Sequence, residues 1–476
     1  MNLKYTWYKI LSILIFTFSF TLLINTNDVK ASSSNNNEKN QSLMIMLDSE
    51  SELGNIAREI RMKFKNIKVK EIDAINVLVA ENFSGDEIEE FKTYLKQDLG
   101  VSEDEIATDL SLDVPIVEKI SHGTSLLLDN YEINSPNIYD ELLWDIKLVT
   151  NNYASYQLSK GSPEIKVGII DSGIDFNHPA LKDNIISQGH SFVPGEMSTQ
   201  DYLGHGTMVA GVIAADGKMK GIAPEIGLVP YKVFDAKGAN SSWVIEAIIQ
   251  ATNDDMDVVN LSLSTFKSLK NKDDRAIIKA YEKAFRYAKK HNTTLVVSAG
   301  NEGLDITNPK LLAEQLEKPE DLIIHLPGGS NHLITVAATN KKNLLSTYSN
   351  YGKNVSILAP GGSYEFDTET YTLDLTSMTL TTFPTNLPQT FISQYLGLDH
   401  GYEMTVGTSV AAPKVTAIVA LLKSEYLKTN NKEMKNEQVE KVLYQTSMKL
   451  DGYDKHISQS GIINAYNALS KMKKYK

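Results

Sequence analysis

Three short motifs each place one reactive side chain at the end of an apolar segment. Asp171 follows a short apolar run, and His205 and Ser409 each precede one. A carboxylate after a buried strand lies at the edge where open α/β sheets hold their chemistry. A serine that opens a buried helix faces backbone N–H groups, which favour developing negative charge. An acid, a base and a hydroxyl in this arrangement are the components of acyl transfer through a serine nucleophile.

Each motif alone has a simpler explanation, since a Gly-Thr-Ser turn or a histidine often caps a helix and an aspartate often caps a turn. Three such motifs in series, each at the tip of an apolar element, favour the catalytic interpretation. Pro413 fits the first turn of the helix that Ser409 opens, because N–H groups there lack partners within the helix.

The motifs resemble the signatures of the subtilisin-like serine proteases, in the family's order of Asp, His and Ser. The matching stretches are IIDSGI at 169–174, GHGTMVAG at 204–211, VVSAGNEG at 296–303 and GTSVAAP at 407–413. The resemblance covers roughly residue 140 to the C-terminus. It implies a serine endopeptidase in which Asp171, His205 and Ser409 form the catalytic triad and Asn301 belongs to the oxyanion hole.

The reaction needs each of these residue types. Serine is a weak nucleophile at neutral pH and requires a base, and the pKa of histidine lies near the working pH. His205 is expected to take the proton of Ser409 and return it to the leaving amine, while Asp171 holds the imidazole tautomer. Asn301 is expected to stabilise the tetrahedral oxyanion beside the Ser409 backbone N–H.

The segment from residue 136 to 476 alternates between apolar strands and helices, which predicts an α/β fold. Its parallel sheet is expected to carry helices on both faces, as in subtilases. The expected strands are 165–170, 227–234, 258–263, 295–299, 333–338 and 355–358. The expected helices are 208–215, 243–253, 276–290, 410–422, 437–446 and 462–469.

The first 31 residues have the pattern of a secretory signal peptide, which predicts a secreted, extracellular protein with no stable membrane anchor after cleavage. Lys4 and Lys9 precede an apolar run at 10–24 that is short for a membrane span, and 29–31 offers a cleavage point. An uncleaved anchor is the alternative. The chain has no cysteine, which excludes disulfides and thiolate metal sites, and its net charge of −12 argues against nucleic-acid binding.

Residues 32–135 are expected to form a linker and a small α+β prosegment, with a boundary that the polar join at 113–145 does not fix. The expected elements are strands at 43–47 and 75–80 and helices at 56–64 and 85–97, the last capped by Ser84. This unit lies between the expected signal peptide and the protease. That position is the reason why it resembles a subtilase prosegment. Such a segment chaperones folding and then inhibits the enzyme until it is cut away.

Two segments align with those that flank an extended substrate in the family, at 238–243 and 260–264. Binding there is expected by strand addition, through main-chain hydrogen bonds. The expected substrate-binding residues are Ala239, Ser241, Leu261, Ser262, Leu263, Ser264 and Glu302. Ser264 stands where the family usually has glycine. Glu302 and the nearby Asp305 would favour Lys or Arg before the cleaved bond, unless both are ordinary surface carboxylates.

No cofactor is required for this chemistry. A structural calcium ion is left open, but it is not supported at the usual site of the family. Ala180 stands where many relatives have a ligating aspartate, and the loop at 216–220 is short and basic. Two insertions, at 304–326 and 364–398, are expected to form surface loops near the cleft. His122 and His178 are not expected to be catalytic, and His178 fits turn packing.

Within the family, the chain looks most like the secreted leader peptidases of lantibiotic gene clusters. The grounds are its size, the signal and prosegment, the sequence LWDIK at 143–147 and the missing calcium loop. The expected substrate is then a lantibiotic precursor, cut after a basic residue. A degradative extracellular subtilase of broad preference is the main alternative, and a non-catalytic binding scaffold is a third.

Overall fold

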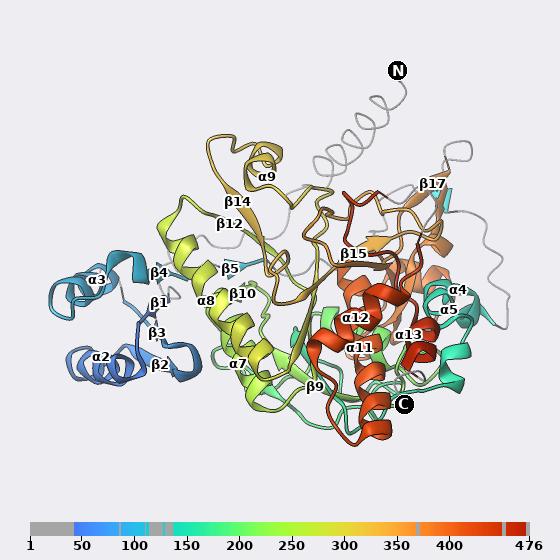
Figure 1. Cartoon of the computed structure of the whole chain (residues 1–476), viewed down its shortest axis with the longest axis horizontal. Coiled ribbons are helices and arrows are strands. Elements are labelled where there is room, and N and C mark those ends of the chain that lie inside the picture. The colour runs from blue at the N-terminus through green and yellow to red at the C-terminus, as the bar shows by residue number, and fades with distance from the viewer. Residues whose placement is uncertain are drawn as a thin grey trace.

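The computed structural model describes residues 42–84, 87–109, 111–113, 127–128, 137–367, 372–449 and 454–472. The expected signal peptide, most of the join at 113–145 and His122 lie outside these residues. The described chain forms a large α/β body and an N-terminal unit, the described residues between 42 and 112, which lies against one flank of the body (Figure 1). None of the described helices combines the length and apolar character needed to cross a membrane.

A seven-stranded sheet in which every neighbouring pair is parallel runs through the large body, in the order β16-β15-β13-β11-β7-β9-β8. Its strands are β7 (Lys166–Asp171), β8 (His190–Ser191), β9 (Gly227–Lys232), β11 (Val258–Leu261), β13 (Thr294–Ser298), β15 (Ile334–Thr339) and β16 (Ile357–Pro360). The six strands expected from the sequence are all present, and only the two-residue edge strand β8 was not foreseen. The predicted α/β fold is confirmed.

Helices cover both faces of this sheet, as the apolar runs of its strands require. Alternate residues of each strand face opposite cores, so Val167 and Ile169 contact one core and Ile170 the other. Helices α6, α11, α12 and α13 cover the first face, and α7 and α8 cover the second. Their bounds are α6 (His205–Ala214), α7 (Ser241–Asn253), α8 (Lys272–Lys290), α11 (Thr408–Asn430), α12 (Asn436–Thr446) and α13 (Ala465–Met472).

The N-terminal unit is a four-stranded antiparallel sheet with two helices on its outer face, in the strand order β2-β3-β1-β4. Its elements are β1 (Leu43–Met46), α2 (Glu50–Lys63), β2 (Lys68–Ile72), β3 (Val77–Glu81), α3 (Glu87–Gln97) and β4 (Ile106–Thr108). Strands β2 and β4 were missed. Three of the five residues of β2 are lysine or glutamate, and β4 has only three residues, so neither has a strong apolar signal.

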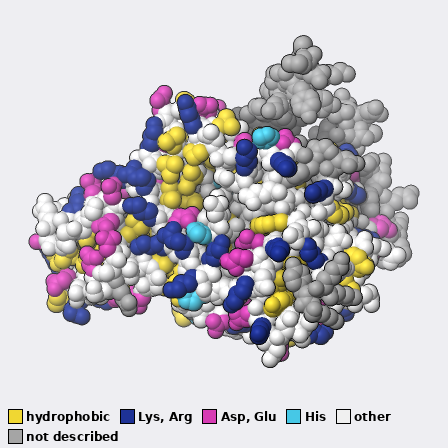
Figure 2. Space-filling view, viewed as in Figure 1, with side chains coloured by type: hydrophobic (Ala, Val, Ile, Leu, Met, Phe, Trp, Pro, Cys, Tyr) yellow, Lys and Arg dark blue, Asp and Glu magenta, His cyan; other side chains and the backbone are white. Residues whose placement is uncertain are grey.

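The inner face of this small sheet packs on α7 and α8 (Figure 1). Met44, Met46, Val77 and Val79 share one buried cluster with residues of both helices. Two polar contacts reinforce the packing. Asp109 accepts from the backbone N–H of Ser242 at the start of α7, at 3.2 Å, and Lys70 forms an ion pair with Glu246 at 3.5 Å. On the face shown in Figure 2, side chains of both charges are interspersed over the unit and the large body.

The end of the N-terminal unit adds a strand to the large body. Strand β5 (Ser111–Leu112) pairs antiparallel with β10 (Ala239–Asn240). This is one of the two segments expected to hold a substrate by strand addition. The chain's own N-terminal unit occupies that edge.

The two insertions are not simple surface loops, and that expectation was wrong. Residues 304–326 include α9 (Pro309–Gln315) and β14 (Ile323–Leu326), which pairs with β12 (Thr265–Ser268). Residues 364–398 include β17 (Glu365–Asp367), β18 (Thr372–Asp374), β19 (Thr379–Thr382) and α10 (Phe391–Tyr395). Strand β19 pairs with β20 (Tyr402–Thr405), and Leu373 and Leu380 belong to the main core. Burial of apolar residues at these positions gives the insertion its regular structure.

A buried ion pair fixes the start of the large body to its central helix. Two short helices, α4 (Ile138–Leu142) and α5 (Trp144–Thr150), lead into the body. Asp145 lies 2.8 Å from the ammonium of Lys414 on α11, and both side chains have no exposed surface. Burial lowers the pKa of Lys414, and the charge of Asp145 offsets part of this effect. The pair is therefore costly to break, because either charge alone would stay buried without compensation.

We predict that Asp145→Leu lowers the free energy of unfolding by about 3–5 kcal/mol, because it leaves Lys414 buried and unpaired. Denaturant unfolding of both proteins in a Ser409→Ala background, which prevents self-digestion, measures the difference. The matched control is the double variant Asp145→Leu/Lys414→Met, which removes both charges and should unfold near the starting protein. Equal losses in the single and double variants would contradict the buried pair as the cause.

Candidate active site

The predicted acid and base are in direct contact. Asp171 ends β7 and His205 begins α6, so both lie at the carboxyl edge of the sheet. The Nδ1 atom of His205 lies 2.8 and 2.9 Å from the two carboxylate oxygens of Asp171, and both side chains are buried. This contact fixes the imidazole with Nδ1–H toward the carboxylate, which leaves Nε2 as the basic atom.

A second carboxylate, Asp201, holds the N-terminus of α6. It accepts hydrogen bonds from the backbone N–H groups of Leu203, Gly204 and Thr207 at 2.8–3.0 Å. It also accepts from the Ser172 hydroxyl at 2.9 Å. A negative side chain here satisfies unpaired donors and complements the helix dipole. Asp201 was not among the residues expected at the site, although an aspartate just before a helix start is a recognisable capping signal.

The surroundings of His205 set its proton affinity. Burial lowers the pKa of the imidazole, but the charge and hydrogen bond of Asp171 raise it, and the charge of Asp201 adds to this. The pKa of His205 is therefore higher than its usual value. His205 is neutral, and able to act as a base, only above this raised pKa.

The other end of the site is the start of α11. Its first residue, Thr408, donates both its backbone N–H (2.9 Å) and its hydroxyl (2.8 Å) to the Oδ1 atom of Asn301. Because Oδ1 accepts these bonds, the Nδ2 group of Asn301 points away from Thr408, and a Cβ added at Gly407 would lie 3.6 Å from it and 3.0 Å from the Ser409 Oγ. Among the described residues, the Ser409 backbone N–H and hydroxyl have no hydrogen-bond partner. Two donors of this kind beside a hydroxyl form an oxyanion-hole arrangement.

Pro413 lies in the second turn of α11, not in the first turn as expected. Without an N–H it cannot bond the carbonyl of Ser409, four residues earlier. The Ser262 hydroxyl donates to that carbonyl instead, at 2.7 Å, and accepts from Asn260 at 2.8 Å. The Ser262 side chain therefore supports the serine turn, and the expected contact of this segment with substrate through its main chain stays a prediction.

The two halves of the site meet because α6 packs against α11. Within the described chain, no hydrogen bond joins His205 to Ser409. Such bonds are often long before substrate binds and shorten in the complex. The structure thus brings the acid and the base into contact, and places the serine beside the predicted oxyanion donor.

The remaining expected substrate residues fall into two groups. The side chains of Ala239, Ser241, Leu261 and Leu263 are buried, so contacts from these segments would use the main chain. Ser264 is partly exposed and Glu302 is exposed. One oxygen of Glu302 accepts from the Asn350 side chain at 2.5 Å; although the residue as a whole is exposed, its neighbours shield the carboxylate from part of the solvent, which raises the pKa of Glu302. Asp305 instead accepts from the backbone of Thr307 at 2.8 Å.

Polar side chains lie close to Gly300, the residue before Asn301. Gly300 has φ +93°, and a Cβ there would lie 2.7 Å from Glu302 and 2.9 Å from the ring of His325. Only glycine fits this position. His325 is buried, and burial lowers its pKa to about 4, so it is neutral.

His178 is also buried, and its Nε2 lies 2.7 Å from the Gly401 carbonyl, which agrees with turn packing.

No group of three or more His, Asp or Glu side chains suited to a metal ion occurs in the part of the chain that the structure describes. Ala180, at the position of the usual calcium ligand, is buried, and its carbonyl accepts from the Asp216 N–H at 2.8 Å. The Asp216 carboxylate forms an ion pair with Lys220 of the same short loop.

Comparison with known proteins gives serine proteases of several kinds, among them two that process leader peptides. Over 337 residues the chain is 31% identical to the epidermin leader peptide-processing serine protease EpiP of Staphylococcus epidermidis, covering 65% of this chain and 70% of that protein. It is 28% identical to the nisin leader peptide-processing serine protease NisP of Lactococcus lactis, of which it covers only 51%.

The solved structure of EpiP from Staphylococcus aureus covers 90% of this chain and 98% of its own, with a TM-score of 0.71 and 26% identity. A model of the subtilase family matches residues 162–465, which is more than half of the chain and includes all four motifs. The chain therefore belongs to the subtilase family of serine proteases.

Proposed function

We propose that Asp171, His205 and Ser409 are the catalytic triad of this serine protease and that Asn301 completes its oxyanion hole. The observation that carries the proposal is the placement of His205 and Ser409 at two helix N-termini, with Asp171 in contact with His205 and Asn301 in contact with Thr408. In that arrangement His205 Nε2 takes the Ser409 proton as the hydroxyl oxygen attacks the peptide carbonyl. The Ser409 N–H and the Asn301 amide stabilise the oxyanion, and His205 then protonates the leaving amine. Water releases the acyl group by the same steps in reverse.

We further propose that the substrate is the leader-bearing precursor of a lantibiotic and that the enzyme acts outside the cell. The names of EpiP and NisP, both leader peptide-processing proteases, support the substrate class. The exposed Glu302, next to Asn301, supports a basic residue before the cleaved bond. The expected signal peptide supports secretion. A broad-specificity degradative protease is the alternative.

The N-terminal unit is proposed to be the inhibitory prosegment. Strand β5 supports this role, because it covers the edge of β10 where a substrate strand is expected to pair. The unit also contacts α7 and α8, so it remains docked by packing as well as by strand pairing. Its release would expose Ala239 and Asn240 for an incoming peptide.

We predict that Asp201→Asn shifts the acid limb of the kcat/KM profile to lower pH. Asp201 raises the pKa of His205, so removing its charge lowers that pKa, and His205 stays neutral at lower pH. The pH at which the acid limb lies does not depend on the fraction of enzyme that is folded, so a partly unfolded variant would not mimic the shift. The matched control, Asp216→Asn, removes an exposed carboxylate beyond the other end of α6 and should leave the limb in place. A limb that stays in place, or moves upward, in Asp201→Asn would contradict this account.

The cleavage-site profile of the secreted enzyme tests the proposed function. We expect cuts confined to bonds after Arg or Lys in a diverse peptide mixture, and none with Ser409→Ala as the blank. Mass spectrometry of the same two proteins should show that the active enzyme has lost its N-terminal unit and that the Ser409→Ala protein has kept it. Scattered cuts after large apolar residues would support the degradative alternative, and cutting by Ser409→Ala would refute the triad.

A further inference from the structure

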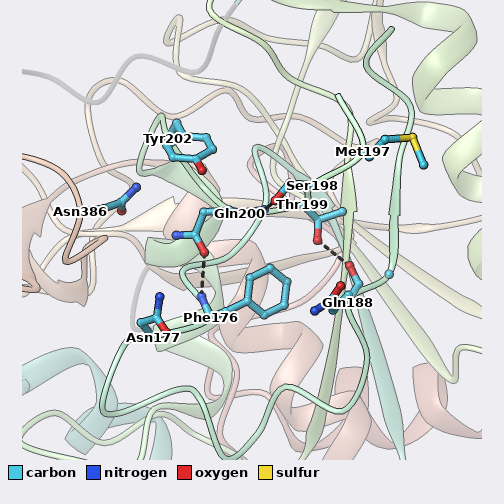
Figure 3. A pocket seen from close by; sticks show the side chains of 10 residues that line it. Phe176, Asn177, Gln188, Met197, Ser198, Thr199, Gln200, Tyr202 and Asn386 are labelled. Carbon is cyan, nitrogen blue, oxygen red and sulfur yellow. Dashed lines mark hydrogen bonds between the residues drawn. The ribbon is translucent and has the colours of Figure 1, made fainter. Parts of the chain in front are cut away.

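A hollow of about 400 Å³ lies beside the loop that leads to His205 (Figure 3). We call it the Tyr202 pocket. Its lining includes Asn177, Gln188, Met197, Gln200, Tyr202 and Asn386. All the residues that line it are uncharged, in a chain of net charge −12. Figure 3 shows Tyr202 and Asn386 on one side of the view and Met197 and Gln188 on the other.

The walls of the pocket are fixed by hydrogen bonds. The Gln200 side chain accepts from the Phe176 backbone at 3.3 Å, and the Thr199 hydroxyl donates to the Gln188 carbonyl at 2.5 Å. Asn386, from the second insertion, donates to the carbonyl of Asp201 at 3.2 Å. The insertion thus builds one wall of the pocket. A pocket formed in advance in this way binds without a large ordering cost.

The pocket presents groups that suit a peptide. Met197 is 96% exposed and Tyr202 is 58% exposed, so an apolar thioether and an aromatic ring stand open to solvent. Among the described residues, the side-chain amides of Asn177 and Gln188 and the Tyr202 hydroxyl have no hydrogen-bond partner. Side-chain amides can pair with a peptide main chain, while the ring and thioether pack on uncharged side chains.

The pocket is connected to the catalytic base by close packing. The backbone of Gly173 packs so closely on Thr199 and Gln200 that a Cβ at residue 173 would clash with them. Gly206 packs equally closely on the backbone of Gly173. Gly206 adjoins His205. Because the histidine returns its proton to the leaving amine, the leaving half of a substrate lies on the histidine side of Ser409.

The amino-side half of a substrate has a different place. Its expected track is β10, which strand β5 occupies in this structure. The Tyr202 pocket contains no residue of β10 or β11. An extended peptide that pairs with β10 and reaches Ser409 therefore has its carboxyl-side residues available for the pocket.

We propose that the Tyr202 pocket binds the uncharged segment of the substrate on the carboxyl side of the cleaved bond. The proposal rests on the proposed function, namely cleavage of a peptide by Ser409. Asn177 and Gln188 bond the main chain of that segment, and Tyr202 and Met197 contact its side chains. For a leader peptidase, this segment is the start of the released product, so the pocket selects precursors by the first residues of that product as well as by the leader.

The test compares three peptides with the same cleavage site: a short one, one extended on the carboxyl side by uncharged residues, and one extended equally on the amino side. Wild type should cut the carboxyl-extended peptide with a higher kcat/KM than the short one. Tyr202→Ala should lose about 2- to 10-fold on the carboxyl-extended peptide, mostly through KM, and little on the other two. The double variant Asn177→Ala/Gln188→Ala should show the same pattern.

The control is Ile186→Ala, which removes a 44% exposed apolar side chain near the amino end of β9, away from the catalytic edge. It should match wild type on all three peptides. An equal loss on the short peptide, or no gain from the carboxyl-side extension, would overturn the proposal. If the pocket proposal fails but every variant still cleaves the short peptide, the proposed protease function stands. If wild type cleaves none of the peptides, the proposed function itself is refuted.

Discussion

The burial of two helix N-termini at one edge of the sheet is the constraint on which the site depends. Backbone N–H groups at a buried helix start need partners. At α6 the chain supplies them, since Asp201 accepts from three backbone N–H groups. At α11 it supplies them only in part, because Asn301 accepts from Thr408 and the Ser409 N–H stays open. The N-terminus of α6, where these N–H groups are paired, carries His205. The N-terminus of α11, where the Ser409 N–H is unpaired, is suited to the oxyanion, which forms only during the reaction.

Much of the surrounding structure serves to keep these two ends in place. The Ser262 hydroxyl replaces the bond that Pro413 cannot make, and the Lys414–Asp145 pair ties α11 to the start of the body. Strand β19 joins both ends, because it pairs with the strand that precedes Ser409 while the Thr382 hydroxyl donates to the Thr207 carbonyl on α6 at 2.6 Å. An element of the second insertion is therefore part of the catalytic framework.

The sequence predicted the features that depend on local pattern. The apolar runs indicated the strands of the large body, and motifs of six to eight residues identified Asp171, His205, Asn301 and Ser409. It did not predict the features that depend on partners distant in the chain. The buried contact of Ser262 requires α11, the regular structure of residues 364–398 requires the main core, and β2 is specified by pairing more than by its own residues.

We propose that the Ser409 N–H of α11 and the Asn301 side-chain amide, which Thr408 orients, together form the donor pair for the oxyanion. Steady-state kinetics of Asn301→Ala test it most directly. Loss of one donor that acts only in the transition state should lower kcat by about 10²–10³ and leave KM nearly unchanged. A variant whose KM rises while kcat is preserved would place Asn301 in substrate binding and contradict the account.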